Sequence, residues 1–180
     1  PETTSSAPLD APDPGSALAQ APPRLRSWYA QAQIDTSTSD PHAAVAAHMI
    51  ARALQESAAE FQASVRLWQL RDRTLLVVSG SAGRGRGPRM RAAISSVVDQ
   101  VRDGLDAASV AASVSEVAWR YRLEARNPQG LVGVIGRALE ATGQPTGAES
   151  YLSRLSAISV TSLATYLGSL SDPLTTELLP

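Results

Sequence analysis

The stretch "SWYAQAQIDTSTSDPHAAVAAHMIARAL", residues 27–54, joins an alternating segment to a helical one, and it decides the fold class. Every second residue from Trp28 to Ile34 would face one way and the residues between them the other, which predicts a strand with one buried face. The run "TSTSDP" breaks this strand. From Pro41 the larger apolar residues fall on one side of a helix.

The flanking sequence repeats these two patterns. The runs "SVRLWQL" and "TLLVVSGS" are rich in β-branched and large apolar residues and predict two strands joined by a tight turn. Further on, apolar spacing predicts helices and a final strand over residues 89–105, 106–126, 127–143, 147–158, 161–170 and 174–180. The order favours an α+β fold: a single layer of mostly antiparallel sheet with helices packed on one face.

The ends of these helices carry their own signals. Gly104 is expected to end the first of the long helices. Asn127 is typical of an N-cap, Pro128 suits the first turn that follows it, and Gly143 suits the stop of the same helix.

Residues 1–23 have a different composition, rich in Pro, Ala, Ser and Asp. Such a segment buries too little apolar surface to offset its ordering entropy, so we expect an extended tail or linker. An ordered tail of this kind needs a second surface, and we expect it to lie on a partner. Residues 24–180 are expected to form the domain.

The composition excludes several kinds of chemistry. The chain has 180 residues, enough for one domain, and a formal net charge of -1, so no global field recruits nucleic acid. Cysteine is absent, which excludes disulfides and thiolate metal sites, and every basic side chain is arginine. No apolar run is long enough to span a bilayer and no signal peptide is visible. Because the sequence begins at Pro1 without methionine, an upstream segment is expected, and a cleaved secretion signal or a cut from a longer precursor would explain its absence.

His42 and His48 are the only histidines and invite a metal reading. In H-E-x-x-H or H-x-x-E-H helices the two histidines are four apart and share a face. Here they are six apart and point about 120° away from each other. No glutamate lies between them, so the residues favour a structural role. We expect no catalytic residue, metal or cofactor.

The loop "SGSAGRGRGPRMR", residues 79–91, resembles a phosphate-binding loop only in its glycines, because the Walker lysine is missing. A simple strand-to-helix connection is favoured. We take the arginines of this loop as candidate partner-contact residues. Trp68 is added to them, because it shares a predicted strand face with Arg66 and Leu70. These residues are Arg84, Arg86, Arg89, Arg91 and Trp68. Core packing is the default expectation for the tryptophans Trp28, Trp68 and Trp119.

The closing segment "GRALEATGQPTGAESYLSRLSAISVTSLATYLGSLSDPLTTELLP" resembles that of the pitrilysin-type zinc metallopeptidases, which include the insulin-degrading enzyme and the mitochondrial processing peptidase. Upstream, "LLVVSGSAG" and "DGLDAASVAASVSEVAWRYR" are similar to the strand and helices of that family, and the likeness covers residues 24–180. The matched residues of the closing segment are Tyr151, Leu152, Arg154, Leu155, Ile158, Val160, Thr161 and Pro180.

The resemblance implies a clamshell of two homologous domains, of which only the first carries H-x-x-E-H on its opening helix. The helix from Pro41 lacks that motif, so the chain resembles the second, non-catalytic half-domain and the core proteins of cytochrome bc complexes. Active relatives often use an Arg-x6-Tyr pair to hold substrate. Arg71 matches the arginine, but Val78 stands at the tyrosine position.

These observations favour a non-catalytic structural subunit, not an enzyme, that binds other protein subunits. One candidate assembly is a membrane-bound energy-transducing complex, and the expected compartment is the periplasm or another extracytoplasmic space. Two alternatives stay open. In the first alternative, the chain is a pseudo-peptidase half that supports a catalytic zinc-peptidase partner. In the second, it is a free-standing module that binds peptides or anionic ligands.

Overall fold

The computed structural model describes residues 27–35, 41–69, 73–142, 147–170 and 172–178. Within these ranges the chain forms one four-stranded antiparallel sheet in the order β2-β3-β1-β4. The strands are β1 (Ser27–Asp35), β2 (Ser64–Gln69), β3 (Thr74–Ala82) and β4 (Leu174–Leu178). The predicted α+β class and the antiparallel sheet are confirmed.

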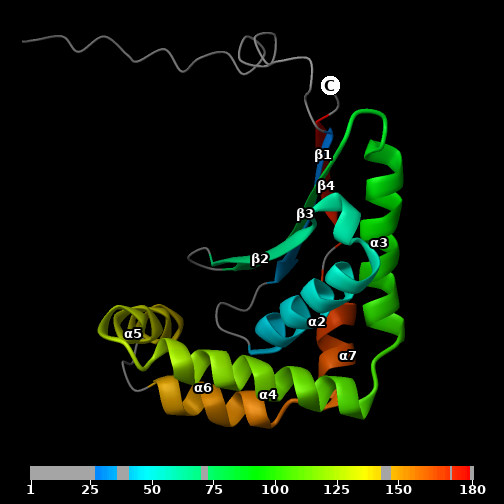
Figure 1. The fold of residues 1–180 in the computed structure, drawn as a ribbon. Coiled ribbons are helices and arrows are strands. Elements are labelled where there is room, and N and C mark those ends of the chain that lie inside the picture. Colours follow the sequence, from blue (N-terminus) through cyan, green and yellow to red (C-terminus); the bar gives the residue numbers. More distant parts are fainter. Residues whose placement is uncertain (1–26, 36–40, 70–72, 143–146, 171, 179–180) are drawn as a thin grey trace, which may run out of the picture.

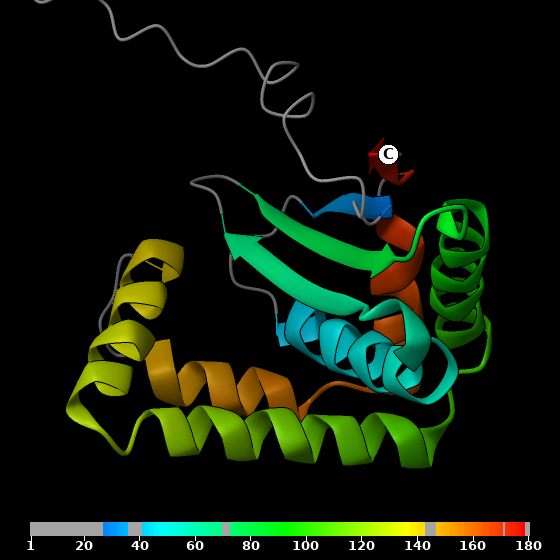
Figure 2. The same cartoon turned by 45° about the horizontal axis from the view of Figure 1, so that its top comes forward.

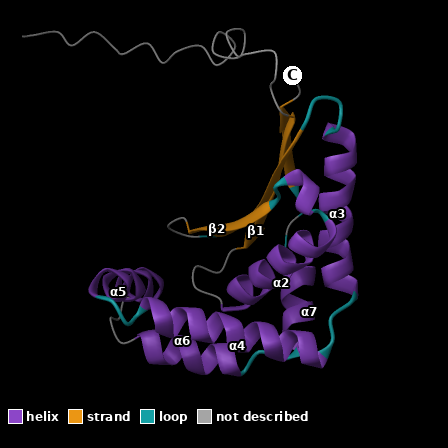
Figure 3. Cartoon of the chain, viewed as in Figure 1, coloured by secondary structure: helices purple, strands orange, loops and turns teal. Residues whose placement is uncertain are grey.

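The helices lie on one side of this sheet (Figure 1). Helices α2, α3 and α7 approach the sheet, whereas α4 and α6 lie side by side beyond α2, and α5 is at the far end (Figures 1 and 3). Their bounds are α2 (Pro41–Ser57), a short 3-10 turn η1 (Ala59–Phe61), α3 (Gly87–Asp103), α4 (Ala107–Glu124), α5 (Pro128–Thr142), α6 (Gly147–Ser156) and α7 (Val160–Ser169).

Two apolar clusters hold these layers together. The first lies between the sheet and α2 and α3, with Ile50, Leu76 and Ile94 almost inaccessible to solvent. The second joins α2 to α4, α6 and α7, through residues such as Val45 and Leu163. Because α2 contributes to both clusters, its burial couples the sheet layer to the outer helices.

One glycine lets α3 lie close to the sheet. A Cβ added at Gly80 of β3 would lie 2.9 Å from Cδ1 of Ile94 and 3.2 Å from Sδ of Met90. Any larger residue would therefore push α3 away from the strand.

The predicted helix ends agree with the structure where it describes them. Gly104 caps α3, and Asn127 precedes α5, whose first residue is Pro128. Residues 1–23, the predicted tail, and Gly143 lie outside the described residues.

Candidate interaction surface

His42, near the start of α2, is built into the packing between helices. Its Nε2 lies 3.1 Å from the Oγ of Ser162 on α7, and its ring stacks on Tyr166 with the centroids 5.7 Å apart. These contacts tie the start of α2 to α7. The position of His42 is therefore explained by a structural role in helix packing.

The Ser162–His42 pair has the spacing of a nucleophile and its base, and sequence reasoning did not find it. Ser162, however, belongs to the N-terminal capping box of α7. Its hydroxyl accepts a hydrogen bond from the Ser159 backbone N–H at 3.0 Å and donates one to the Ser159 carbonyl at 3.1 Å. The hydroxyl is thus engaged by the Ser159 backbone in the helix cap, and its contact with His42 ties α2 to α7.

His48 lies on a different side of α2, facing α4. Burial, followed by the Arg120 guanidinium, lowers the pKa of this imidazole below 6.5, while the Glu116 carboxylate acts in the opposite direction. Arg120 and Glu116 themselves form an ion pair at 2.9 Å. His48 is therefore held neutral at the edge of a surface ion pair.

The residues present do not fit a zinc ion of the peptidase kind. Within the described ranges, no three His, Cys, Asp or Glu side chains converge as a ligand set. His42 and His48 point to different helices, and His42 uses its Nε2 for Ser162. No step of a hydrolytic reaction can be derived from this helix.

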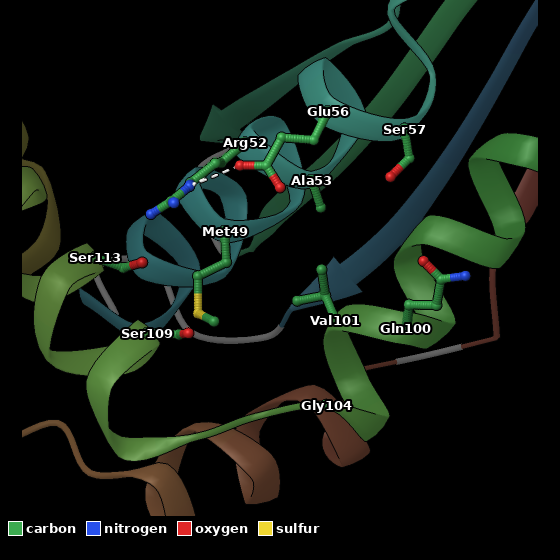
Figure 4. A pocket seen from close by; sticks show the side chains of 10 residues that line it. All are labelled: Met49, Arg52, Ala53, Glu56, Ser57, Gln100, Val101, Gly104, Ser109 and Ser113. Carbon is green, nitrogen blue, oxygen red and sulfur yellow. Dashed lines mark hydrogen bonds and ion pairs between the residues drawn. The ribbon is translucent and has the colours of Figure 1, made fainter.

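An open pocket of about 280 Å³ lies between α2, α3 and the start of α4 (Figure 4). Figure 4 shows Arg52 and Glu56 beside Met49, with Gln100 opposite on α3 and Ser109 on α4. The Arg52–Glu56 ion pair, 3.1 Å long, is itself exposed. No histidine is among the described lining residues, and the one lining carboxylate, Glu56, is paired with Arg52.

The face of the sheet away from the helices has no described element over it (Figures 1 and 3), and we call it the open face. Strand register assigns its members, since directly opposed residues of antiparallel strands share a face. They are Trp28, Ala30, Ala32, Ile34, Ser64, Arg66, Trp68, Leu75, Val77, Ser79, Leu174 and Thr176, together with Ser81, which is opposite Trp28 but only 2% exposed.

The alternation predicted for β1 is present, and it is the polar side that is buried. Gln31 and Gln33 are under 5% exposed beneath the helices, and the Tyr29 hydroxyl donates to Oε1 of Gln31 at 3.2 Å. Trp28, on the other side, is 51% exposed. The strand therefore presents its apolar face outward.

The default core prediction for the tryptophans is wrong. Trp68 is 53% exposed and Trp119 is 55% exposed. Trp28 and Trp68 both lie on the open face, which also carries Leu174, 63% exposed. Large apolar side chains rarely gather on a solvated sheet face without a partner. Trp28 and Leu174 were missed, since a sequence pattern does not show which face lacks a second layer.

The four arginines of the β3–α3 connection and early α3 are exposed, and three of them have partners within the chain. Arg86 and Arg89 share Glu60 of η1, at 3.5 and 3.2 Å. Arg91 binds Glu177 of β4 at 2.9 Å and so fastens the edge strand to α3. Arg84 lies in the exposed turn itself.

The structure does not bring Trp68 and the arginines together. Trp68 is paired with Leu75 at one end of β3, and Arg84 follows the other end at Ala82, roughly 23 Å away at the usual rise of a strand. Trp28, paired with Ser81, is the open-face tryptophan nearest the arginine turn.

Comparison with known proteins was informative for the fold alone. No protein-family model and no curated protein sequence matches the chain. A peptidase M16 inactive domain from Pseudomonas fluorescens matches 86% of the chain with a TM-score of 0.72 and 9% identity, over 40% of its own length.

Two other solved structures share the arrangement. The periplasmic protease PqqL of Escherichia coli matches 88% of the chain at a TM-score of 0.70 and 15% identity. A chain of complex III from Candida albicans matches 84% at a TM-score of 0.69 and 13% identity. The chain spans 20% of the first and 42% of the second.

The sequence resemblance thus agrees with the three-dimensional structure: the chain has the fold of solved pitrilysin-type (M16) peptidase domains, one of them inactive, and of a chain of complex III.

Proposed function

We propose that this chain is a non-catalytic, peptidase-like structural subunit that binds other proteins through the open face of its sheet. The observation that carries the proposal is the apolar open face, with Trp28, Trp68 and Leu174 each more than half exposed. Aromatic side chains in such a position are the residue types that supply most of the binding energy at protein interfaces.

The open face also has the polar elements expected of an interface. Arg66 is on β2, and along the strand direction it falls between Trp68 of β2 and Trp28 of β1. Ser64 and Ser79 hydrogen-bond across the β2–β3 ladder at 3.2 Å. A partner would meet an apolar centre with a cation beside it and hydroxyls at the margin. The arginine turn at Arg84 continues this surface beyond Trp28.

Lack of an activated group supports a non-enzymatic role. The one Ser–His pair of the described residues is a helix cap, and His48 stands beside an ion pair. The likeness to an inactive peptidase domain points in the same direction.

For the assembly, the proposal extends to a larger complex with protein neighbours, on which residues 1–23 would lie. A membrane-bound energy-transducing complex is one such assembly, in line with the likeness to a complex III chain. The likeness to a periplasmic protease favours an extracytoplasmic compartment.

A second function is favoured by the size of the matched chains. This chain spans only 20–42% of the three structures named above, so the matched part is joined to further chain in those proteins. The chain would then support a zinc-peptidase partner. Zinc-dependent peptide cleavage by the pair, absent from either chain alone, would distinguish this role from a purely structural one.

The test uses the full chain isolated with its native partner. Leu174→Asp and Trp68→Glu on the open face are expected to weaken reconstitution of the purified pair by at least about tenfold, since each charge must be desolvated in an apolar contact. The matched control Val132→Asp changes an apolar residue of α5 that is more exposed than either and is expected to leave the pair intact. Equal affinity of all three variants and the wild type would refute the open face as the docking surface.

A further inference from the structure

A second set of apolar side chains is exposed where α4 meets α5, far from the open face. Figures 1 and 2 show α5 projecting beyond the other helices, beside the end of α4 and the start of α6. Val132 of α5 is 71% exposed, the most of any large apolar side chain in the described residues. We call this region the elbow, and its exposed apolar residues are Trp119, Leu123, Leu131, Val132, Ile135 and Leu139.

The elbow residues are arranged as two stripes. On α4, Trp119, Arg122, Leu123 and Arg126 follow one another at i, i+3, i+4 and i+7, so they lie on one side of the helix and its end. On α5 the opposite side is buried, with Val134 only 1% exposed. Each stripe is therefore the solvent side of a helix whose other side is packed.

The stripe on α4 carries positive charge, while Glu124 of the same helix has a partner and Glu149 at the start of α6 is an exposed carboxylate. Glu116 is already paired with Arg120 at 2.9 Å. Arg122 and Arg126 are exposed, and neither forms an ion pair with another described residue. Two uncompensated guanidinium groups thus stand in the same stripe as Trp119 and Leu123, and they are complementary to an anionic surface.

We propose that the elbow docks peripherally on an anionic lipid bilayer. Tryptophan is enriched at the level of lipid headgroups, and arginine can reach phosphates while its stem stays in apolar surroundings. A projecting pair of helix ends can enter a soft interface without the complementary cavity that a rigid protein partner would need. Among the described residues no helix is long and apolar enough to cross the membrane, so the contact is one of surface docking.

This inference rests on residues that the proposed function does not use. The open face and the elbow occupy different elements, the sheet and the α4–α5 junction (Figure 2). Protein binding and lipid binding can therefore fail independently, and a single substitution in each region separates them.

The experiment is co-sedimentation of the full chain with vesicles of phosphatidylcholine alone or of phosphatidylcholine mixed with phosphatidylglycerol. Binding is expected with the anionic vesicles at low salt and is expected to weaken as salt rises, because surface charges are screened. Val132→Asp is expected to lower the partition coefficient at least about tenfold. The double variant Arg122→Gln/Arg126→Gln is expected to lower it and to reduce its dependence on salt.

Leu174→Asp is the matched control, since it places the same charge at a comparably exposed apolar residue of the open face. It should bind vesicles like the wild type, and circular dichroism should show all variants folded. Absence of wild-type binding to anionic vesicles, or equal binding by Val132→Asp, overturns the proposal. So does sedimentation velocity in which the wild type self-associates through the elbow and Val132→Asp is monomeric, which would make the elbow a protein interface.

Discussion

At the scale of single residues, the chemistry of a side chain here is set by what already occupies its hydrogen-bonding atoms. His42 and Ser162 lie 3.1 Å apart, a distance that would suit catalysis. The Ser159 backbone takes up both the hydrogen and a lone pair of that serine, so the pair holds two helices together. The same reasoning applies to Arg91, whose charge is used on Glu177 within the chain.

His48 should make stability depend on pH. Its pKa is lowered in the folded state, by burial first and by Arg120 second, so the unfolded chain binds more protons once the pH falls below about 6.5. The free energy of unfolding should therefore fall as the pH drops through that value. For a group this exposed, the loss is expected to be a few tenths of a kcal/mol, roughly, after screening by solvent. Urea denaturation between neutral pH and pH 5 measures it.

Two variants define the source of that effect. His48→Gln should remove this part of the pH dependence, and Arg120→Gln should reduce it, because Arg52 is then the only cation that opposes the Glu116 carboxylate among the groups acting on His48. If wild type and His48→Gln lost stability in parallel over this range, the explanation would be wrong.

At the scale of elements, helix boundaries depend on contacts close in the chain. Asn127 accepts a hydrogen bond from the Gly130 backbone N–H at 2.7 Å through its side chain, and it donates another to the Glu124 carbonyl at 3.3 Å. It therefore satisfies groups at the end of α4 and at the start of α5 together. A Cβ at Gly130 would lie 2.0 Å from the Glu124 carbonyl oxygen, so the turn also requires that glycine.

Removing this cap should loosen α5. Asn127→Ala is expected to cost about 1 kcal/mol in unfolding free energy, the usual contribution of an N-cap side chain. Asn127→Asp keeps the acceptor and places a negative charge at a helix N-terminus, so it should stay near the wild type. Hydrogen exchange of the α5 backbone amides measures the effect locally. Exchange unchanged in Asn127→Ala would show that packing against α6 alone defines this helix start.

At the scale of the whole molecule, the described helices all lie on one side of one sheet, and two exposed apolar regions remain in the described residues. The open face belongs to the curved sheet and carries Trp28 and Trp68, whereas the elbow lies where α5 projects and carries Trp119 (Figure 1). Neither is explained by the stability of the chain itself, because exposed apolar area contributes nothing to its folding. The proposed binding of a protein at the open face and of a lipid surface at the elbow accounts for both regions.

The chain should behave as a protein without a zinc site. Zinc in molar excess, or a chelator, is expected to shift the thermal midpoint by less than about 1 °C, since a ligand stabilises only the state that binds it. Scanning calorimetry of the dialysed full chain, with elemental analysis for zinc, tests this. Stoichiometric zinc accompanied by hydrolysis that a chelator abolishes would contradict both this expectation and the proposed function.

Local patterns were sufficient for the order of elements and for many of their ends. Alternation from Trp28 to Ile34 predicted β1, apolar spacing predicted α3 through Met90 and Ile94, and Asn127 predicted the start of α5. These features arise from contacts within a few residues, which a sequence displays directly. The turn η1 was not foreseen, because its residues carry no such signal.

The candidate surface was only partly accessible to the same reasoning. Trp68 was singled out and lies on the open face, but Trp28 and Leu174, which lie on other strands of the same face, were not, and the arginines proved to be partly committed to Glu60 and Glu177. Glu60 and Glu177 are far from these arginines in the chain. These ion pairs form only because the fold places η1 and β4 next to the β3–α3 connection and α3.

The sequence by itself determined that this is an α+β chain without cysteine or lysine and with two histidines too far apart on their helix for a zinc motif. Only the tertiary structure decided that the apolar side of β1 faces outward, with Gln31 and Gln33 beneath the helices. The physical reason is that a period of two places side chains on two faces but does not say which face another layer will cover. That choice depends on where α2 and α3 pack, and it is made by contacts distant in sequence.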